Sequence, residues 1–183
     1  MTSPLRGRFD IGPSNGRLRI RTWRQGLAAR AGHDLVLEAA QWHGHVEVPA
    51  DASGPASIEV EVDLRRIRVV EGTGGMKPLS EADKADIYKA MQRSLSADAH
   101  PVARFTSSEV KADGDQATVT GELSIAGQSH PLRLDVHRAA DGTLSASGRV
   151  VQSAWGIKPY TGFLGALKLR DAVDVDVELQ LPG

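Results

Sequence analysis

The sequence contains no cysteine among its 183 residues, which excludes disulfide bonds, thiolate chemistry and the usual structural zinc sites. It also lacks a strong net charge. The formal value of −1 argues against a global basic field that would gather nucleic acid or an anionic membrane. No run of about 18 apolar residues is present, so no transmembrane segment is expected. The start, MTSPLRGRFDIG, has no signal-peptide core, and we therefore expect a soluble cytoplasmic protein.

What the sequence does have is a regular alternation of apolar and polar residues, the period of a β-strand with one buried face. The run SIEVEVDL places Ile58, Val60 and Val62 on one face, and AVDVDVELQL repeats the pattern near the C-terminus. Turn signals such as ADGDQ and AADGT separate the runs. Strands are predicted near 17–23, 33–39, 41–49, 56–64, 101–111, 116–126, 129–138, 143–152 and 168–181, of which the second and third could be one long, bent strand.

About eight strands in sequential order predict an all-β fold. The expected architecture is an antiparallel lipocalin-like β-barrel, closed so that no free edge remains, in a single domain over 1–183. Several inward positions carry small residues, namely Gly44, Gly121, Ala146 and Gly148. These residues indicate bends of the barrel, room for a ligand in its lumen, or both.

One segment, PLSEADKADIYKAMQRSLS, departs from the strand period. Ser80 and Asp83 have the spacing of a helix capping box, and Ile87 and Met91 recur at a step of four residues. An amphipathic helix inserted into the barrel is therefore predicted over 80–96.

The stretch GLAARAGHDLVLEA raises the question of catalysis, because a histidine and an aspartate follow a glycine. Strand parity puts His33 and Asp34 on opposite faces, and no nucleophile motif accompanies them. His33 shares its parity with Leu35, so it is expected at the barrel rim, as a structural residue or as a ligand contact.

The pair His43 and His45 raises the question of a metal, since two imidazoles at i and i+2 can chelate one ion. Their parity, shared with Glu47, places them opposite Val46 on the expected outer face. The other histidines have the sequence context of solvent-facing residues: His100, His130 and His137. No catalytic residue and no metal ligand is assigned.

The segment SAWGIKPYTGFLGALK, over 153–168, concentrates aromatic residues in a sequence that has only 4% of them. It contains Trp155, Tyr160 and Phe163. Because exposing so much apolar surface on a loop is unfavourable, the segment is expected either to plug one barrel end or to form a lid that contacts a ligand.

Two sequence elements carry a resemblance to a known family. The first is HPVARFTS and the second is GELSIAGQSHP, with the matching positions His100, Pro101, Phe105, Ser107, Gly121, Leu123, Ile125, Gly127 and Pro131. Together with the order of the strands, they make the chain resemble the YceI-like, polyisoprenoid-binding family over about 9–181. The sequence departs from the family pattern in its first third, where ARAGHDLVLEAAQWHGHV stands, and we interpret it as a cytoplasmic branch.

The resemblance implies a non-catalytic barrel that needs no cofactor and whose lumen takes a polyisoprenoid or isoprenoid-quinone-like lipid. Each buried methylene of such a chain would contribute roughly 0.8 kcal/mol. The polar head would lie at the mouth, for which Arg24, Arg30, His33 and Lys158 are the candidates. The expected ligand contacts are His33, Arg30, Trp42, Val60, Val62, Met91, Leu123, Val150, Trp155, Lys158, Tyr160 and Phe163.

Two other functions stay open from the sequence. The first is a histidine-dependent or metal-dependent hydrolase-type enzyme built on His33 or on the pair His43 and His45. The second is a structural or interaction module whose barrel is simply filled. A homodimer is compatible with each of these functions.

Overall fold

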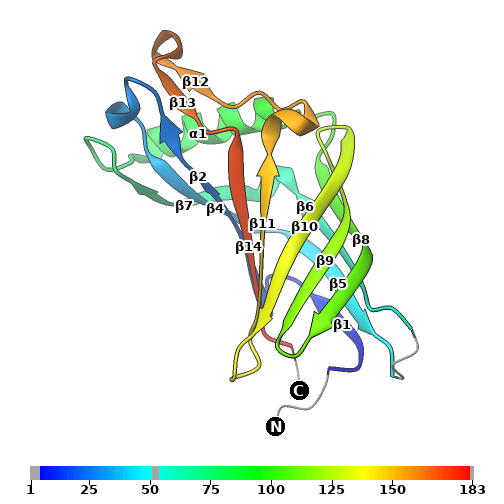
Figure 1. Cartoon of the computed structure of the whole chain (residues 1–183). Coiled ribbons are helices and arrows are strands. Elements are labelled where there is room, and N and C mark those ends of the chain that lie inside the picture. Colours follow the sequence, from blue (N-terminus) through cyan, green and yellow to red (C-terminus); the bar gives the residue numbers. More distant parts are fainter. Residues whose placement is uncertain (1–4, 51–53, 182–183) are drawn as a thin grey trace.

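The computed structural model of the chain describes residues 5–50 and 54–181 (Figure 1). Within these residues the chain is mostly strand, with one α-helix, α1 (Glu81–Ser94), and four short 3-10 turns, η1 (Ala29–Ala31), η2 (Leu64–Arg66), η3 (Gln152–Trp155) and η4 (Phe163–Gly165). The strands are β1 (Gly7–Ile11), β2 (Gly16–Thr22), β3 (Arg24–Gln25), β4 (Asp34–Ala39), β5 (Trp42–Val48), β6 (Ser57–Asp63), β7 (Ile67–Thr73), β8 (Val102–Asp113), β9 (Gln116–Ile125), β10 (Gln128–Arg138), β11 (Leu144–Val151), β12 (Thr161–Gly162), β13 (Leu167–Leu169) and β14 (Ala172–Leu179).

Eleven of these strands form one antiparallel sheet in the order β1-β5-β6-β8-β9-β10-β11-β14-β2-β4-β7, and β12, β13 and β3 form a small second sheet. Strands β8 to β11 pair with their sequence neighbours, and β14 pairs with β2, which joins the two ends of the chain. Figure 1 shows this sheet curled into an elongated barrel. The predicted antiparallel lipocalin-like barrel with one inserted helix is confirmed.

The predicted bent strand is divided at Ala40 and Gln41, so that β4 pairs with β2 and β7 while β5 pairs with β1 and β6. Backbone hydrogen bonds bridge the break. The N–H of Ala40 donates to the oxygen of Arg66 at 2.8 Å, and the N–H of Asp63 donates to that of Gln41 at 3.0 Å. These two bonds bring the chain between β4 and β5 next to the chain between β6 and β7, so the two ends of the sheet come close together here. Strands β1 and β7 still end its order, so the expectation of a barrel without free edges is wrong.

Two strands of the sheet, β1 and β7, were not predicted from the sequence. Strand β1 is short and lies between glycines, and β7 follows the turn η2 with an irregular burial pattern. The last predicted strand, 168–181, is interrupted at Arg170 and Asp171, which separate β13 from β14. The other predicted strands agree with the observed ones to within two residues at each end.

The helix begins where the capping box predicts. The Ser80 hydroxyl accepts the N–H of Asp83 at 3.1 Å, and the Asp83 carboxylate accepts the N–H of Ser80 at 2.9 Å. Further along α1, the side-chain amide of Gln92 donates to the backbone oxygen of Leu64 at 2.8 Å. This bond fixes the helix across the barrel end that lies opposite the two chain termini in Figure 1.

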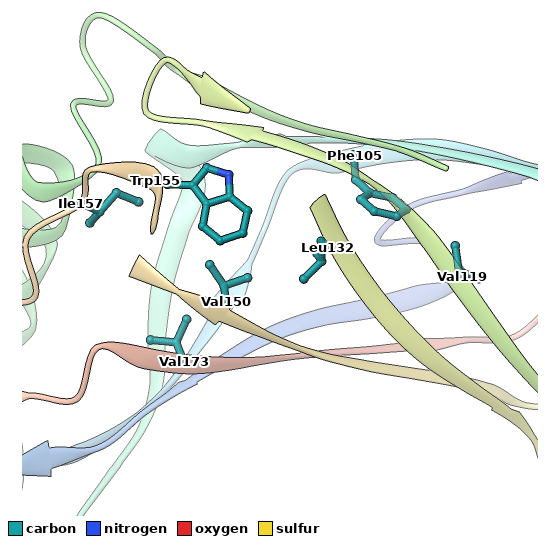
Figure 2. Packing of buried hydrophobic residues seen from close by; sticks show 7 residues of the cluster. All are labelled: Phe105, Val119, Leu132, Val150, Trp155, Ile157 and Val173. Atoms are coloured by element: carbon teal, nitrogen blue, oxygen red, sulfur yellow. The ribbon is translucent and has the colours of Figure 1, made fainter. Parts of the chain in front are cut away.

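The buried side chains inside the barrel form separate clusters. Figure 2 shows one cluster of buried side chains that come from five strands, from η3 and from the loop after it: Phe105, Val119, Leu132, Val150, Trp155, Ile157 and Val173. A second cluster, with Trp42 packed among Ile11, Leu18, Ala39 and Leu179, fills the barrel toward the end where β1 and the last residues of β14 lie. That end is therefore closed by side chains.

The small inward residues serve this packing. A Cβ on Gly121 would collide with the backbone oxygen of Thr106 and with the ring of Phe105, and one on Gly44 would collide with the backbone of Glu59. Gly121 is thus covered by an aromatic ring from the neighbouring strand. At these two glycines the structure shows close contact with the neighbouring strand, and neither of them lines the cavity described below.

Candidate ligand-binding cavity

The other half of the barrel holds a cavity of ≈ 910 Å³. Small-molecule sites are commonly about 300–1,000 Å³, so this is a large one. Its wall is made chiefly of aliphatic side chains from the inner faces of the strands, among them Leu18, Ile20, Leu35, Leu37, Val60, Val62, Ile67, Leu123, Ile125, Leu134, Val150, Val173, Val175 and Val177. The lining continues to the exposed residues Met76 and Phe163, where the cavity opens to solvent.

The cavity is long in the direction of the strands. Its lining follows the chain from Leu18 to Arg24, which is roughly 20 Å at a rise of about 3.3 Å per residue. It includes Val173, Val175 and Val177 on the neighbouring strand β14. A deep apolar space that is open at one end favours an elongated ligand.

Polar groups gather at the mouth. The Nε2 atom of His33 lies 2.7 Å from the backbone oxygen of Lys77, within hydrogen-bond distance. The Asp34 carboxylate instead accepts the backbone N–H of Arg24 at 2.8 Å, and the Arg24 guanidinium donates to the backbone oxygen of Gly32 at 2.6 Å. His33 and Asp34 therefore have separate partners, as strand parity predicts, and form no dyad.

The helix α1 supplies the wall of the mouth that faces these groups. Ile87 and Met91 line the cavity, together with the carboxylate of Asp83. Hydrogen bonds from the side chain and the backbone of Ser80 lower the pKa of Asp83, and the charge of His33 acts in the same direction. The helix thus brings a carboxyl group to the mouth, near His33.

A single buried polar residue, Thr22, lies within the part of the chain that the structure describes. It is 6% exposed and lines the cavity, and its hydroxyl oxygen has no hydrogen-bond partner. A buried polar atom without a partner costs about 1–3 kcal/mol, so this hydroxyl makes the cavity wall less stable than an apolar side chain of the same shape would. The alternation of Leu18, Ile20 and Thr22 is the sequence signal that could have revealed it.

The structure places most of the sequence-predicted ligand contacts around the cavity. Those that line it are His33, Val60, Val62, Met91, Leu123, Val150, Tyr160 and Phe163. Arg24, named from the sequence as a candidate for the polar mouth, also lines it.

Four of the predicted contacts lie elsewhere. Arg30 and Lys158 are exposed and stand outside the cavity lining. Trp42 is only 4% exposed and belongs to the cluster that fills the far end of the barrel. Trp155 is equally buried, and its indole N–H donates to the backbone oxygen of Leu123 at 2.8 Å. Periodicity predicts which face a strand residue takes but not its height along the barrel, and this explains the difference for Trp42.

The segment 153–168 combines the two roles proposed for it. Trp155 and Leu167 are buried, so its two ends pack against the barrel as a plug would. Tyr160 and Phe163, between them, line the mouth of the cavity and stay exposed, in the position of a lid.

The remaining histidines lie apart from the cavity. His43 is 78% exposed on the outer face, 3.4 Å from Glu61. His130, expected to face solvent, instead packs edge-on against Trp155 with a ring separation of 5.3 Å, because both side chains meet beside η3. Among the described residues no three side chains that could ligate a metal come together.

An antiparallel barrel that is filled at one end and holds a deep apolar cavity at the other defines a lipocalin-like class of protein. The model of the YceI-like domain matches residues 9–181, and the chain belongs to the YceI-like family. This family has a β-barrel fold that is known for binding hydrophobic ligands and is not a known class of enzyme.

Curated relatives match parts of the chain. A UPF0312 protein of Pectobacterium atrosepticum is 37% identical over 79 residues, which are 42% of this chain and 36% of that protein. Protein YceI of Escherichia coli O6:H1 is 31% identical over 124 residues, 66% of this chain and 54% of that protein. The matches thus span about a third to about half of the length of these relatives.

Solved structures match more of the chain at lower identity. The crystal structure of Burkholderia cenocepacia BcnA has a TM-score of 0.64 and 18% identity, and the match covers 90% of this chain and 94% of that one. A Campylobacter jejuni YCEI protein has a TM-score of 0.57 and 16% identity, with 80% and 84% covered. At this identity the likeness supports the fold alone. Over the described residues, no helix is both long and apolar enough to cross a membrane.

Proposed function

We propose that the protein binds and carries a long-chain apolar ligand, a polyisoprenoid or an isoprenoid-quinone-like lipid, in the barrel cavity without catalysing a reaction. The observation that carries the proposal is the elongated cavity of ≈ 910 Å³ with its aliphatic wall. A flexible apolar chain gains roughly 0.8 kcal/mol for each methylene that leaves water, so binding needs no particular polar contact along the chain. We place this activity in the cytoplasm and expect no nucleic-acid partner and no required cofactor.

The polar groups at the mouth support an orientation for this ligand. The chain would lie toward Leu18, and the head group would remain near Arg24 and His33. Arg24 and His33 both already bond to backbone oxygens, so a polar head would contact them by sharing or replacing these bonds.

The two other functions have less support. An enzyme built on His33 would need a nucleophile or a base beside it, whereas its ring bonds to a backbone oxygen. A metal site at His43 and His45 would use side chains outside the cavity, one of them 78% exposed. A purely structural barrel would be filled by side chains throughout, whereas this barrel has an open cavity.

The test compares two matched substitutions on adjacent strands. Val62→Phe adds a ring inside the cavity, while Val102→Phe adds the same ring to an exposed position on β8. Purified protein is extracted into organic solvent, and the extract is analysed by mass spectrometry. Stripped protein is then titrated with a dansyl-labelled farnesyl ether.

We expect the wild type and Val102→Phe to bind the farnesyl probe alike, and Val62→Phe to bind it roughly tenfold more weakly because about two methylene equivalents of contact are lost. Equal binding by all three proteins, or no binding by the wild type, would contradict the proposal. Light scattering on the same samples measures whether the protein forms the homodimer that we also propose.

A further inference from the structure

Four apolar side chains around the mouth are exposed to an unusual degree. Leu27 and Leu164 are fully exposed, at 101% and 109%, and Met76 and Phe163 are exposed by 78% and 65%. No other large hydrophobic residue in the described chain exceeds 44%. We call these four residues the rim. Large apolar side chains that gather in solvent usually mark an interaction surface.

The rim comes from three segments that meet at the cavity. Met76 and Phe163 line the opening, and the backbone N–H of Ala28, next to Leu27, donates to the oxygen of Ala166 at 2.9 Å. In Figure 1 the loops before β4, after β7 and between β12 and β13 project from the barrel end that lies opposite the termini. The rim therefore surrounds the entrance of an apolar space.

The loop that carries two rim residues has an unusual backbone. Phe163 and Leu164 both have positive φ angles, 49° and 55°, a conformation that residues with a Cβ seldom adopt. The turn is held by a hydrogen bond from the N–H of Ala166 to the oxygen of Phe163 at 3.1 Å. Packing inside the protein does not explain this conformation, because Leu164 is fully exposed.

The three segments are also basic, although the whole chain has a net charge of −1. Residues 26–33, 74–78 and 156–170 contain no acidic residue, and their exposed cations are Arg30, Lys77, Lys158, Lys168 and Arg170. The acidic groups of the mouth, Asp83 and Asp86, belong to α1.

We propose that the rim docks the mouth of the barrel onto an anionic lipid bilayer. Protruding apolar tips flanked by lysine and arginine suit the boundary between acyl chains and negative head groups, where each basic side chain adds to the attraction. A bilayer receives separate loop tips without the shape complementarity that a protein partner requires. The docked mouth would face the acyl region, so that an apolar chain could pass into the cavity without crossing water.

The experiment measures co-sedimentation of the full chain with vesicles of phosphatidylcholine alone and of phosphatidylcholine with 30% phosphatidylglycerol. The test variant is Leu27→Ser with Leu164→Ser. Its matched control is Val102→Thr with Val151→Thr, at apolar residues that are exposed on the strands β8 and β11. A third variant, Lys158→Ala with Lys168→Ala, removes charge only.

We expect the wild type and the control to partition onto the anionic vesicles, with roughly tenfold weaker partitioning for the rim variant and a loss of the preference for anionic vesicles in the lysine variant. Equal partitioning of the wild type and the rim variant, or no partitioning of the wild type, would overturn the proposal. So would a dimer that dissociates in the rim variant while vesicle binding is absent.

The docking surface depends on the exposure and charge of the rim and not on the identity of the ligand. Titration of the farnesyl ether in vesicle-free buffer separates the two proposals. The rim variant should bind this probe as the wild type does, even where its vesicle binding is lost.

Discussion

At the scale of single residues, Thr22 combines features that a purely apolar cavity would not need. Its hydroxyl is buried on the cavity wall, beside the leucines and valines that bury a chain, and it has no partner there. The nearby polar groups of the mouth, Arg24 and His33, already bond to backbone oxygens. Thr22 is therefore a position at which the wall gives up stability, because its hydroxyl oxygen has neither a partner nor contact with the cavity space.

Replacing Thr22 by valine, which has nearly the same shape, tests this role. We expect the free energy of unfolding of stripped protein to rise by about 1 kcal/mol, because an unsatisfied hydroxyl leaves the interior. Affinity for a farnesyl ligand with a hydroxyl head and affinity for the corresponding hydrocarbon should both stay unchanged, because the Thr22 hydroxyl oxygen does not reach the cavity space. Urea unfolding and competition against the dansyl probe measure the two effects. A loss of stability, or a loss of affinity for the hydroxyl-headed ligand alone, would refute the assignment.

The sequence predicted which face of a strand a side chain takes. It did not predict how far along the barrel a residue lies or which side chains of other elements it contacts. Parity correctly separated His33 from Asp34 and placed His43 outside. It could not show that Trp42 lies in the filled end of the barrel rather than beside the cavity, because residues of the same parity line both. Nor could it show that His130 packs against Trp155, since that contact joins two different elements.

At the scale of elements, one carboxylate links three neighbouring strands on the outside of the barrel. Glu38 on β4 accepts hydrogen bonds from Arg19 on β2 at 3.1 Å and from Arg68 on β7 at 2.8 Å. The hydrogen bond from Arg68 is the main cause of a lowered pKa at Glu38, with Arg19 acting in the same direction. The arginines of the first strands thus pair across the sheet.

The lowered pKa of Glu38 predicts a pH dependence. A carboxyl whose pKa is lower in the folded state stabilises the fold above its unfolded pKa, and this stabilisation is lost as the pH falls through the folded value. We expect Glu38→Gln to cost about 1 kcal/mol of unfolding free energy at pH 7 and almost nothing in strong acid. Asp135→Asn, at an exposed pair with Arg133, is the control and should leave the acid dependence unchanged. Urea unfolding at several pH values measures both, and parallel curves for Glu38→Gln and the wild type would contradict the expectation.

The elements themselves were largely predictable, because alternation and the capping box are local signals. The helix was expected over 80–96 and is observed over Glu81–Ser94. The two strands that were missed depend on pairing with a neighbouring strand: β1 is stabilised by β5, and β7 by β4. Their own sequences are too short, or alternate too irregularly, to predict a strand.

At the scale of the whole molecule, a ligand that binds in the cavity of the folded protein should raise the free energy of unfolding. Stripped protein with the farnesyl ether at about one hundred times its Kd should gain roughly 2.7 kcal/mol, or a rise in Tm of about 5–10 °C. Val62→Phe should show a smaller rise, because its ring occupies part of the cavity. Calorimetry measures the shift, and a Tm that does not respond to the probe would contradict a site inside the barrel.

The small sheet of β12, β13 and β3 has a consequence for how the mouth can move. This sheet joins the segment 153–168 to the chain before β4. Backbone hydrogen bonds from the N–H of Ala28 to the oxygen of Ala166 and from the N–H of Arg170 to the oxygen of Trp23 strengthen the connection. The opposite wall is formed by α1 and is held by side chains: Gln92 donates to the backbone oxygen of Leu64, and Ile87 and Met91 pack against the core. One side of the entrance is thus held by backbone hydrogen bonds and the other by side chains alone, so we expect the helix to shift before the small sheet does when a bulky ligand widens the entrance.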